Sequence, residues 1–166
     1  IREGTAIGPA CRVGGEVEES IVHGYSNKYH DGFLGPAYVC EWVNLGALCT
    51  NSDLKNDYST VELYLNGQLM DSGDTKVGSF IADHTKLSIG TLLNTGTIIG
   101  MMDNLVASGG VLPKYNPSFV WVINNIPMKG AGLKTMIQMA KTVMSRRDVE
   151  MTVDEGEPVP METDDG

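Results

Sequence analysis

The chain has 166 residues, of which 42% are hydrophobic, so it can bury one sizeable core or two smaller ones. No apolar run comes near the ~18 residues of a membrane-spanning helix, and no N-terminal stretch resembles a secretory signal. Eight of the 21 acidic residues lie in residues 148–166, where Lys and Arg are absent, and the rest of the chain carries 13 acidic and 12 basic side chains. This balance excludes the basic field of a nucleic-acid-binding surface. We therefore expect a cytoplasmic protein without nucleic-acid or membrane partners.

Apolar residues five or six apart recur in residues 5–45, each with a small or apolar residue two positions before it. The pairs are Thr5 with Ile7, Cys11 with Val13, Gly32 with Leu34, Ala37 with Val39, and Val43 with Leu45. Six is a multiple of the two-residue period of a strand but not of the 3.6-residue period of a helix. Each hexad therefore predicts one short strand and a corner, with both residues of a pair on one side.

The same pattern becomes regular in residues 79–111. Its apolar members are Ile81, Leu87, Leu93, Ile99, Leu105 and Val111, and its small members are Ser79, Thr85, Thr91 and Thr97. A period held over this length predicts an all-β solenoid, whose filled interior consists of these residues. An ordinary all-β domain with a turn every six residues is the alternative. In a solenoid, the chemistry belongs to polar residues that break the hexad pattern.

Three segments depart from the hexads. Residues 60–75 alternate around Asn66-Gly67, which predicts a β-hairpin arm that projects from the solenoid. The stretch from Pro113 to Trp121 is expected to cap the last open edge. A helix is expected from Gly130 to Arg147, with Met136 and Ala140 on its apolar face. The predicted domains are a solenoid at 1–125, a helical segment at 126–147 and an acidic disordered tail at 148–166.

Polar residues concentrate between positions 25 and 58. His30 is a natural general base near neutral pH, and Asn44 can hold an amide or a hydroxyl of a substrate. Lys55 and Asn56 follow at the exit of the segment, and a lysine can hold a phosphate. Residue type alone also allows His30 to be a surface histidine and Asn44 to be a corner residue that satisfies backbone groups.

Three motifs resemble the acetyltransferase half of the GlmU-type bifunctional enzymes: HDGFLG at 30–35, WVNLGA at 42–47 and TN at 50–51. Longer strings at 77–100 and 112–121 resemble GlmU-like sugar nucleotidyltransferases, and the likeness covers residues 1–147. The resemblance implies a left-handed parallel β-helix, a homotrimer with sites between subunits, and acetyl-CoA and a sugar phosphate as substrates. The handedness comes from the resemblance alone, because crossovers between parallel strands are normally right-handed.

The resemblance also assigns roles to single residues. His30 matches the catalytic base that takes a proton from the acceptor amine as it attacks the thioester. Asn44 matches a residue that binds the acceptor sugar or the acetyl group, and Phe33 replaces a tyrosine that contacts the acceptor. Ala47 matches a position whose backbone faces acetyl-CoA. Further candidates are Arg12, Lys28, Lys55 and Asn56 for the acceptor, and Asp83 and His84 for the cofactor.

In one segment the chain departs from the family pattern, so the identity of the acceptor sugar is not assigned. The family places a phosphate-holding lysine just before the catalytic region, where this chain has Gly15-Glu16-Val17-Glu18-Glu19. Glutamates in that position would repel a sugar phosphate.

The predicted function is acyl transfer from acetyl-CoA to the amine or hydroxyl of an amino-sugar phosphate or a related sugar. The alternative is a non-catalytic trimerisation or regulatory domain of a sugar-1-phosphate nucleotidyltransferase. Because the chain starts with Ile1 rather than Met, we expect an N-terminal nucleotidyltransferase domain to be missing. A zinc site like that of γ-type carbonic anhydrases could use His23, His30 and His84. No close histidine pair supports it, and we expect no metal.

Overall fold

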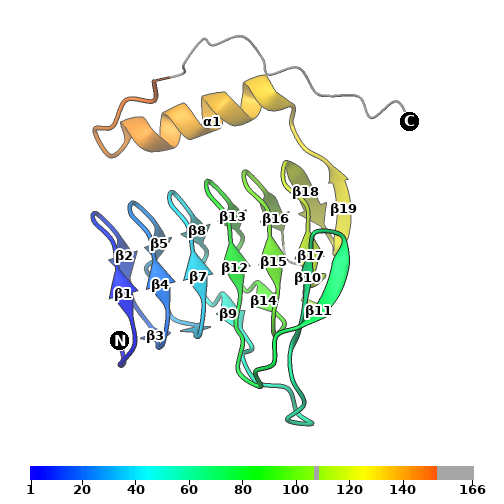
Figure 1. Ribbon diagram of the computed structural model, residues 1–166. Coiled ribbons are helices and arrows are strands. Elements are labelled where there is room, and N and C mark those ends of the chain that lie inside the picture. The colour runs from blue at the N-terminus through cyan, green and yellow to red at the C-terminus, as the bar shows by residue number, and fades with distance from the viewer. Residues whose placement is uncertain (107–108, 153–166) are drawn as a thin grey trace.

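The computed structural model describes residues 1–106 and 109–152 of the chain. Very short parallel strands stack into a solenoid with three faces (Figure 1). Face A consists of β1 (Ala6–Ile7), β4 (Ile21–Val22), β7 (Tyr38–Val39), β12 (Phe80–Ile81), β15 (Ile98–Ile99) and β17 (Tyr115–Asn116). Face B consists of β2 (Arg12–Val13), β5 (Asn27–Lys28), β8 (Asn44–Leu45), β13 (Lys86–Leu87), β16 (Asn104–Val106) and β18 (Val120–Ile123).

The third face, face C, consists of β3 (Glu16–Val17), β6 (Phe33–Leu34), β9 (Thr50–Asn51) and β14 (Leu92–Leu93). Between β6 and β9 the backbone ladder is replaced by side-chain bonds, because the Asn51 amide group bonds both the N–H and the C=O of Gly35. The predicted solenoid is therefore confirmed, with one strand of each face in a complete coil.

The hexad residues from Leu34 to Leu105 fill the interior as predicted, whereas Ile7 in the first coil is exposed. Ile81, Leu87, Ile99 and Leu105 are at most 2% exposed, and the four small Ser and Thr residues two positions before Ile81, Leu87, Leu93 and Ile99 are fully buried. The prediction for Val111 was wrong. It is exposed, while Leu112 is buried, so the interior position moves by one residue after Leu105. A one-residue shift exchanges the two sides of a strand, which explains the reversal.

The hairpin between β9 and β12 is formed by β10 (Glu62–Leu65) and β11 (Gln68–Asp71). Both Asn66 and Gly67 have positive φ, as a type I′ turn requires. The arm does not project freely. The Tyr64 and Tyr115 rings lie 4.6 Å apart, and Lys114 Nζ donates to the Glu62 carbonyl, so the arm packs on the last coil.

The end of the solenoid is closed by a second hairpin rather than by an extended cap. Strand β19 (Ile126–Lys129) runs antiparallel to β18 and occupies the open edge of face B. The helix α1 (Leu133–Ser145) begins later than predicted, because Gly132 has a φ of 82° and cannot extend the helix backwards. Of the predicted tail, residues 153–166 lie outside the described residues.

Helix α1 lies along the row of corners that join face A to face B, and it runs from the last coil back to the first (Figure 1). Its Met136 and Ala140 side chains are buried. Beyond its C-terminal end, the Arg147 guanidinium donates to the Ala10 carbonyl and to Asn27 Oδ1, each at 2.7 Å. The helix therefore covers one edge of face B and is fixed at both ends.

Candidate functional site

The outward positions of faces A and B differ sharply in chemistry. On face A the residues in register are Ala6, Ile21, Tyr38, Phe80, Ile98 and Tyr115. On face B they are Arg12, Asn27, Asn44, Lys86, Asn104 and Trp121. Face B therefore presents a column of cations and carboxamides, and a polar ligand fits this face.

A first cavity, the His30 cavity, has a volume of about 340 Å³ on face B. It is lined by Arg12, Asn27, Tyr29, His30, Asn44, Leu45, Gly46, Ala47 and Ile89. Four of the residues predicted from the sequence, Arg12, His30, Asn44 and Ala47, thus come together here from three successive coils and the corners that follow them. The sequence analysis missed Asn27, although it lies between Arg12 and Asn44 in the strand register.

His30 lies at an exposed corner, where its ring and the Tyr29 ring are arranged edge to face with their centroids 5.4 Å apart. Neither ring nitrogen of His30 is hydrogen-bonded to another described residue, so the imidazole is available to a ligand. Asn44 accepts a long hydrogen bond of 3.4 Å from Asn27 Nδ2, which leaves its own amide donors open. The Ala47 carbonyl accepts a hydrogen bond from the Gly90 amide, whereas the Ala47 N–H has no acceptor among the described residues.

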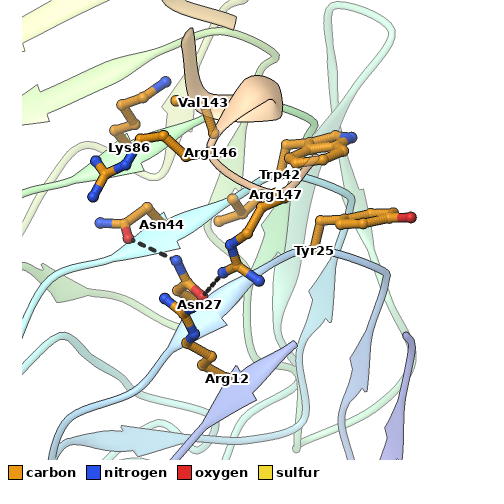
Figure 2. Close-up of a pocket in the computed structure, with 10 residues that line it drawn as sticks. Arg12, Tyr25, Asn27, Trp42, Asn44, Lys86, Val143, Arg146 and Arg147 are labelled. Atoms are coloured by element: carbon orange, nitrogen blue, oxygen red, sulfur yellow. Dashed lines mark hydrogen bonds between the residues drawn. The ribbon is translucent and has the colours of Figure 1, made fainter. Parts of the chain in front are cut away.

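A second cavity, the helix cavity, has a volume of about 380 Å³ and lies between face B and the C-terminal end of α1 (Figure 2). Its lining residues are Arg12, Tyr25, Asn27, Trp42, Val43, Asn44, Lys86, Val143, Arg146 and Arg147. The two cavities share Arg12, Asn27 and Asn44, so they adjoin. The sequence analysis did not place Arg146 and Arg147 at this site, because the contact between the end of α1 and face B spans more than 100 residues.

Aromatic side chains form one wall of the helix cavity. Tyr25, Trp42 and His84 occupy equivalent corners with φ of 61°, 60° and 58°. The Tyr25 and Trp42 rings stack at 4.2 Å, and the Trp42 and His84 rings are parallel at 6.0 Å. Burial, and next the nearby Lys86 ammonium, lower the pKa of His84. His84 therefore packs in a corner column and lines neither cavity.

Several predicted binding residues lie elsewhere. Lys28 is 3% exposed and occupies an interior position between the aliphatic residues of neighbouring coils. Its Nζ donates to the Gly14 and His30 carbonyls, and burial lowers its pKa. Lys28 is therefore part of the structure beneath His30 and does not reach the cavity.

The remaining candidates also have structural partners or separate positions. Lys55 Nζ donates to Ser59 Oγ and the Thr60 carbonyl within its own loop. Asp83 Oδ1 accepts from the Glu41 amide at a corner. Phe33 lies on face C, and the exposed Asn56 follows Lys55 in the same loop, so none of these side chains lines either cavity.

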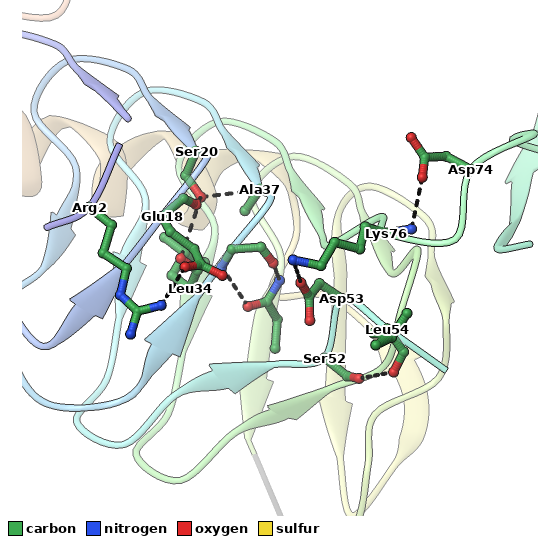
Figure 3. A network of polar contacts seen from close by, with 12 residues as sticks. Arg2, Glu18, Ser20, Leu34, Ala37, Ser52, Asp53, Leu54, Asp74 and Lys76 are labelled. Atoms are coloured by element: carbon green, nitrogen blue, oxygen red, sulfur yellow. Dashed lines mark hydrogen bonds and ion pairs between the residues drawn. The ribbon is translucent and has the colours of Figure 1, made fainter. Parts of the chain in front are cut away.

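The glutamates before His30 do not face the cavities. Glu16 and Glu18 both pair with Arg2, at 2.8 Å each, and the Glu18 pair is drawn in Figure 3. Their negative charge is therefore directed to the N-terminal end of face C. The expectation that these glutamates repel a sugar phosphate stays a prediction.

Histidines, cysteines and carboxylates form no group of three suitable for a metal ion within residues 1–106 and 109–152. Over the same residues, no helix has both the length and the apolar character needed to cross a membrane.

Comparison with known proteins relates about half of the chain to a known enzyme, and no family model matches the chain. The chain is 32% identical over 85 residues to a bifunctional sugar-1-phosphate nucleotidylyltransferase/acetyltransferase of Sulfurisphaera tokodaii. Half of this chain is a distant homologue of that enzyme. The match covers 51% of the chain but 21% of the relative, so the chain spans about a fifth of the relative's length.

Proposed function

We propose that this chain carries the acetyltransferase site of a sugar-nucleotide biosynthesis enzyme and transfers an acetyl group from acetyl-CoA to an amino sugar or its phosphate. Arg12, His30, Asn44 and Ala47 converge on one exposed cavity, and this convergence carries the proposal. The name of the homologue, which includes both sugar-1-phosphate and acetyltransferase, supports it independently. The hexapeptide-type solenoid is also the fold that the resemblance implies.

The reaction needs a base beside the attacking amine. The amine nitrogen forms a bond to the thioester carbonyl carbon and gives a tetrahedral intermediate, while His30 accepts the proton that the nitrogen loses. The intermediate then expels the CoA thiolate, which takes up a proton. The open amide of Ala47 is suited to hold the oxygen that becomes negative, and the Asn44 side chain is suited to orient the acceptor.

We also propose that the chain forms a homotrimer and works with a nucleotidyltransferase domain. The apolar outward column of face A supports assembly, since Ile21, Tyr38, Phe80 and Tyr115 are each 38–45% exposed. The same column favours the second candidate function, a non-catalytic trimerisation domain. Analytical ultracentrifugation tests assembly: Phe80→Glu dissociates the trimer, whereas a wild-type monomer would rule it out.

A thiol-release assay with acetyl-CoA and a panel of amino sugars and their phosphates separates the two functions. If His30 is the base, His30→Ala lowers kcat about 10²–10⁴-fold. His23→Ala is the matched control, because His23 Nε2 bonds Tyr38 Oη and lines neither of these cavities. Equal CoA release by the wild type and His30→Ala would leave the assembly function as the better description.

A further inference from the structure

We propose that the helix cavity binds a phosphate monoester through Arg12, Lys86 and Arg146. This proposal goes beyond acyl transfer, because it concerns a site that α1 completes and that does not contain His30.

The charge of the cavity is the first observation. Four cationic side chains line it, and no Asp or Glu is among its lining residues. Within residues 1–106 and 109–152 the ion pairs involve Arg2 and Lys76 instead, and the side chains of Arg12 and Arg146 have no hydrogen-bond or ion-pair partner there. Uncompensated cations held around one hollow attract an anion, most strongly a doubly charged one.

The position of the helix is the second observation. Arg147 bonds two neutral acceptors, the Ala10 carbonyl and Asn27 Oδ1, so it anchors the end of α1 without losing its charge to a carboxylate. Figure 2 shows Arg146 beside Lys86 of β13 and Asn44 of β8, which are adjacent strands of face B. The anchor therefore holds a free guanidinium above the column of face B, and a guanidinium matches phosphate oxygens in geometry.

The other walls define what accompanies the phosphate. Asn27 and Asn44 offer amide donors and acceptors for hydroxyl groups, and the stacked Tyr25 and Trp42 side chains form an aromatic wall. A volume of about 380 Å³ admits a sugar phosphate or the phosphorylated ribose of a nucleotide-like cofactor. Both are phosphate monoesters, and since the cavity adjoins the His30 cavity, either would lie next to the proposed acyl-transfer site.

Isothermal titration calorimetry without an acyl donor tests the proposal with two matched ligand pairs: glucosamine-1-phosphate against glucosamine, and CoA against dephospho-CoA. We expect the phosphorylated member of at least one pair to bind at least tenfold more tightly, and its affinity to fall with added salt. The pair that shows the difference identifies the source of the phosphate. Inorganic phosphate measures the contribution of the anion alone.

Arg146→Gln should raise the Kd of that ligand about tenfold, as expected for loss of one charged hydrogen-bond donor. Lys141→Gln, an exposed lysine of the same helix that does not line the cavity, should leave the Kd unchanged. Equal affinity of the wild type and Arg146→Gln, or no preference for the phosphorylated member of either pair, overturns the proposal. His30→Ala should slow acyl transfer about 10²–10⁴-fold and keep phosphate binding, so the two proposals fail separately.

Discussion

Asp103 is a buried carboxyl group whose ionisation should limit the stability of the solenoid. It is 1% exposed and occupies the small-residue position two residues before Leu105, where the coil beneath it has Thr85. Its Oδ1 accepts from the Val120 amide at 3.0 Å, but its Oδ2 is buried without a partner. Burial raises the pKa of Asp103 to about 7, although backbone amides partly oppose the shift.

The sign of the pH effect follows from this raised pKa. Between pH 3.8 and about 7, Asp103 is protonated in the folded chain and ionised in the unfolded chain. The folded state therefore binds more protons, and its stability falls by about 1.4 kcal/mol for each pH unit as the pH rises. The contribution is complete below pH 3.8 and is lost as the pH passes 7. From pH 5 to pH 8 the loss is about 2–3 kcal/mol.

Asp103→Asn keeps an oxygen acceptor for Val120 and removes the charge. Urea unfolding of both proteins at pH 5, 6, 7 and 8 gives their stability difference at each pH. We expect the variant to gain about 2–3 kcal/mol relative to the wild type across this range, whatever the difference at pH 5. Parallel stability curves would show that the carboxyl group is not buried and would refute the reasoning.

Three further predictions concern packing and the helix anchor. Gly78→Ala should lower the free energy of unfolding by about 3 kcal/mol or more, because its Cβ would overlap two backbone carbonyl oxygens of the neighbouring coil. The control is Gly73→Ala, whose added Cβ meets open space, and it should lower the free energy of unfolding by about 1 kcal/mol because Gly73 has a positive φ. Equal thermal midpoints of the two variants would contradict the close packing around Gly78. Arg147→Gln should speed hydrogen exchange in the last turns of α1 and leave the strands protected; unchanged exchange would mean that the anchor is not formed. Burial raises the pKa of the Cys49 thiol, so iodoacetamide at pH 8 should modify it far more slowly in the native than in the urea-unfolded chain, and equal rates would refute its burial.

The sequence was sufficient to predict the solenoid because its interior repeats at a fixed spacing. Where an interior position carries an unusual residue, the pattern misleads. Lys28 appeared to be a free cation near the site, yet it occupies an aliphatic position and satisfies two carbonyl groups. A charged side chain can be buried when its hydrogen bonds are provided, and only the neighbouring coils reveal that they are.

The sequence predicted the part of the candidate site that face B and its corners contribute, but not the part that helix α1 contributes. Asn44 lies in register with Asn27 of the adjacent coil, and His30 lies at the corner that follows Asn27, so the repeat brings the two side chains to one cavity. Arg146 reaches the same face through the path of α1, which depends on Gly132 and on the Arg147 anchor rather than on any repeat. Long-range contacts of this kind leave no periodic signal in the sequence.

The central claim is that His30 serves an acetyl-transfer site, and mass spectrometry of the acceptor tests it most directly. Wild-type chain, His30→Ala and His23→Ala are incubated with isotopically labelled acetyl-CoA and the amino-sugar acceptor selected by the thiol-release panel. We predict labelled N-acetyl product from the wild type and His23→Ala, and a rate that is lower by a factor of about 100 or more from His30→Ala. Labelled product formed equally by all three proteins, or by none with any acceptor of the panel, would contradict the claim.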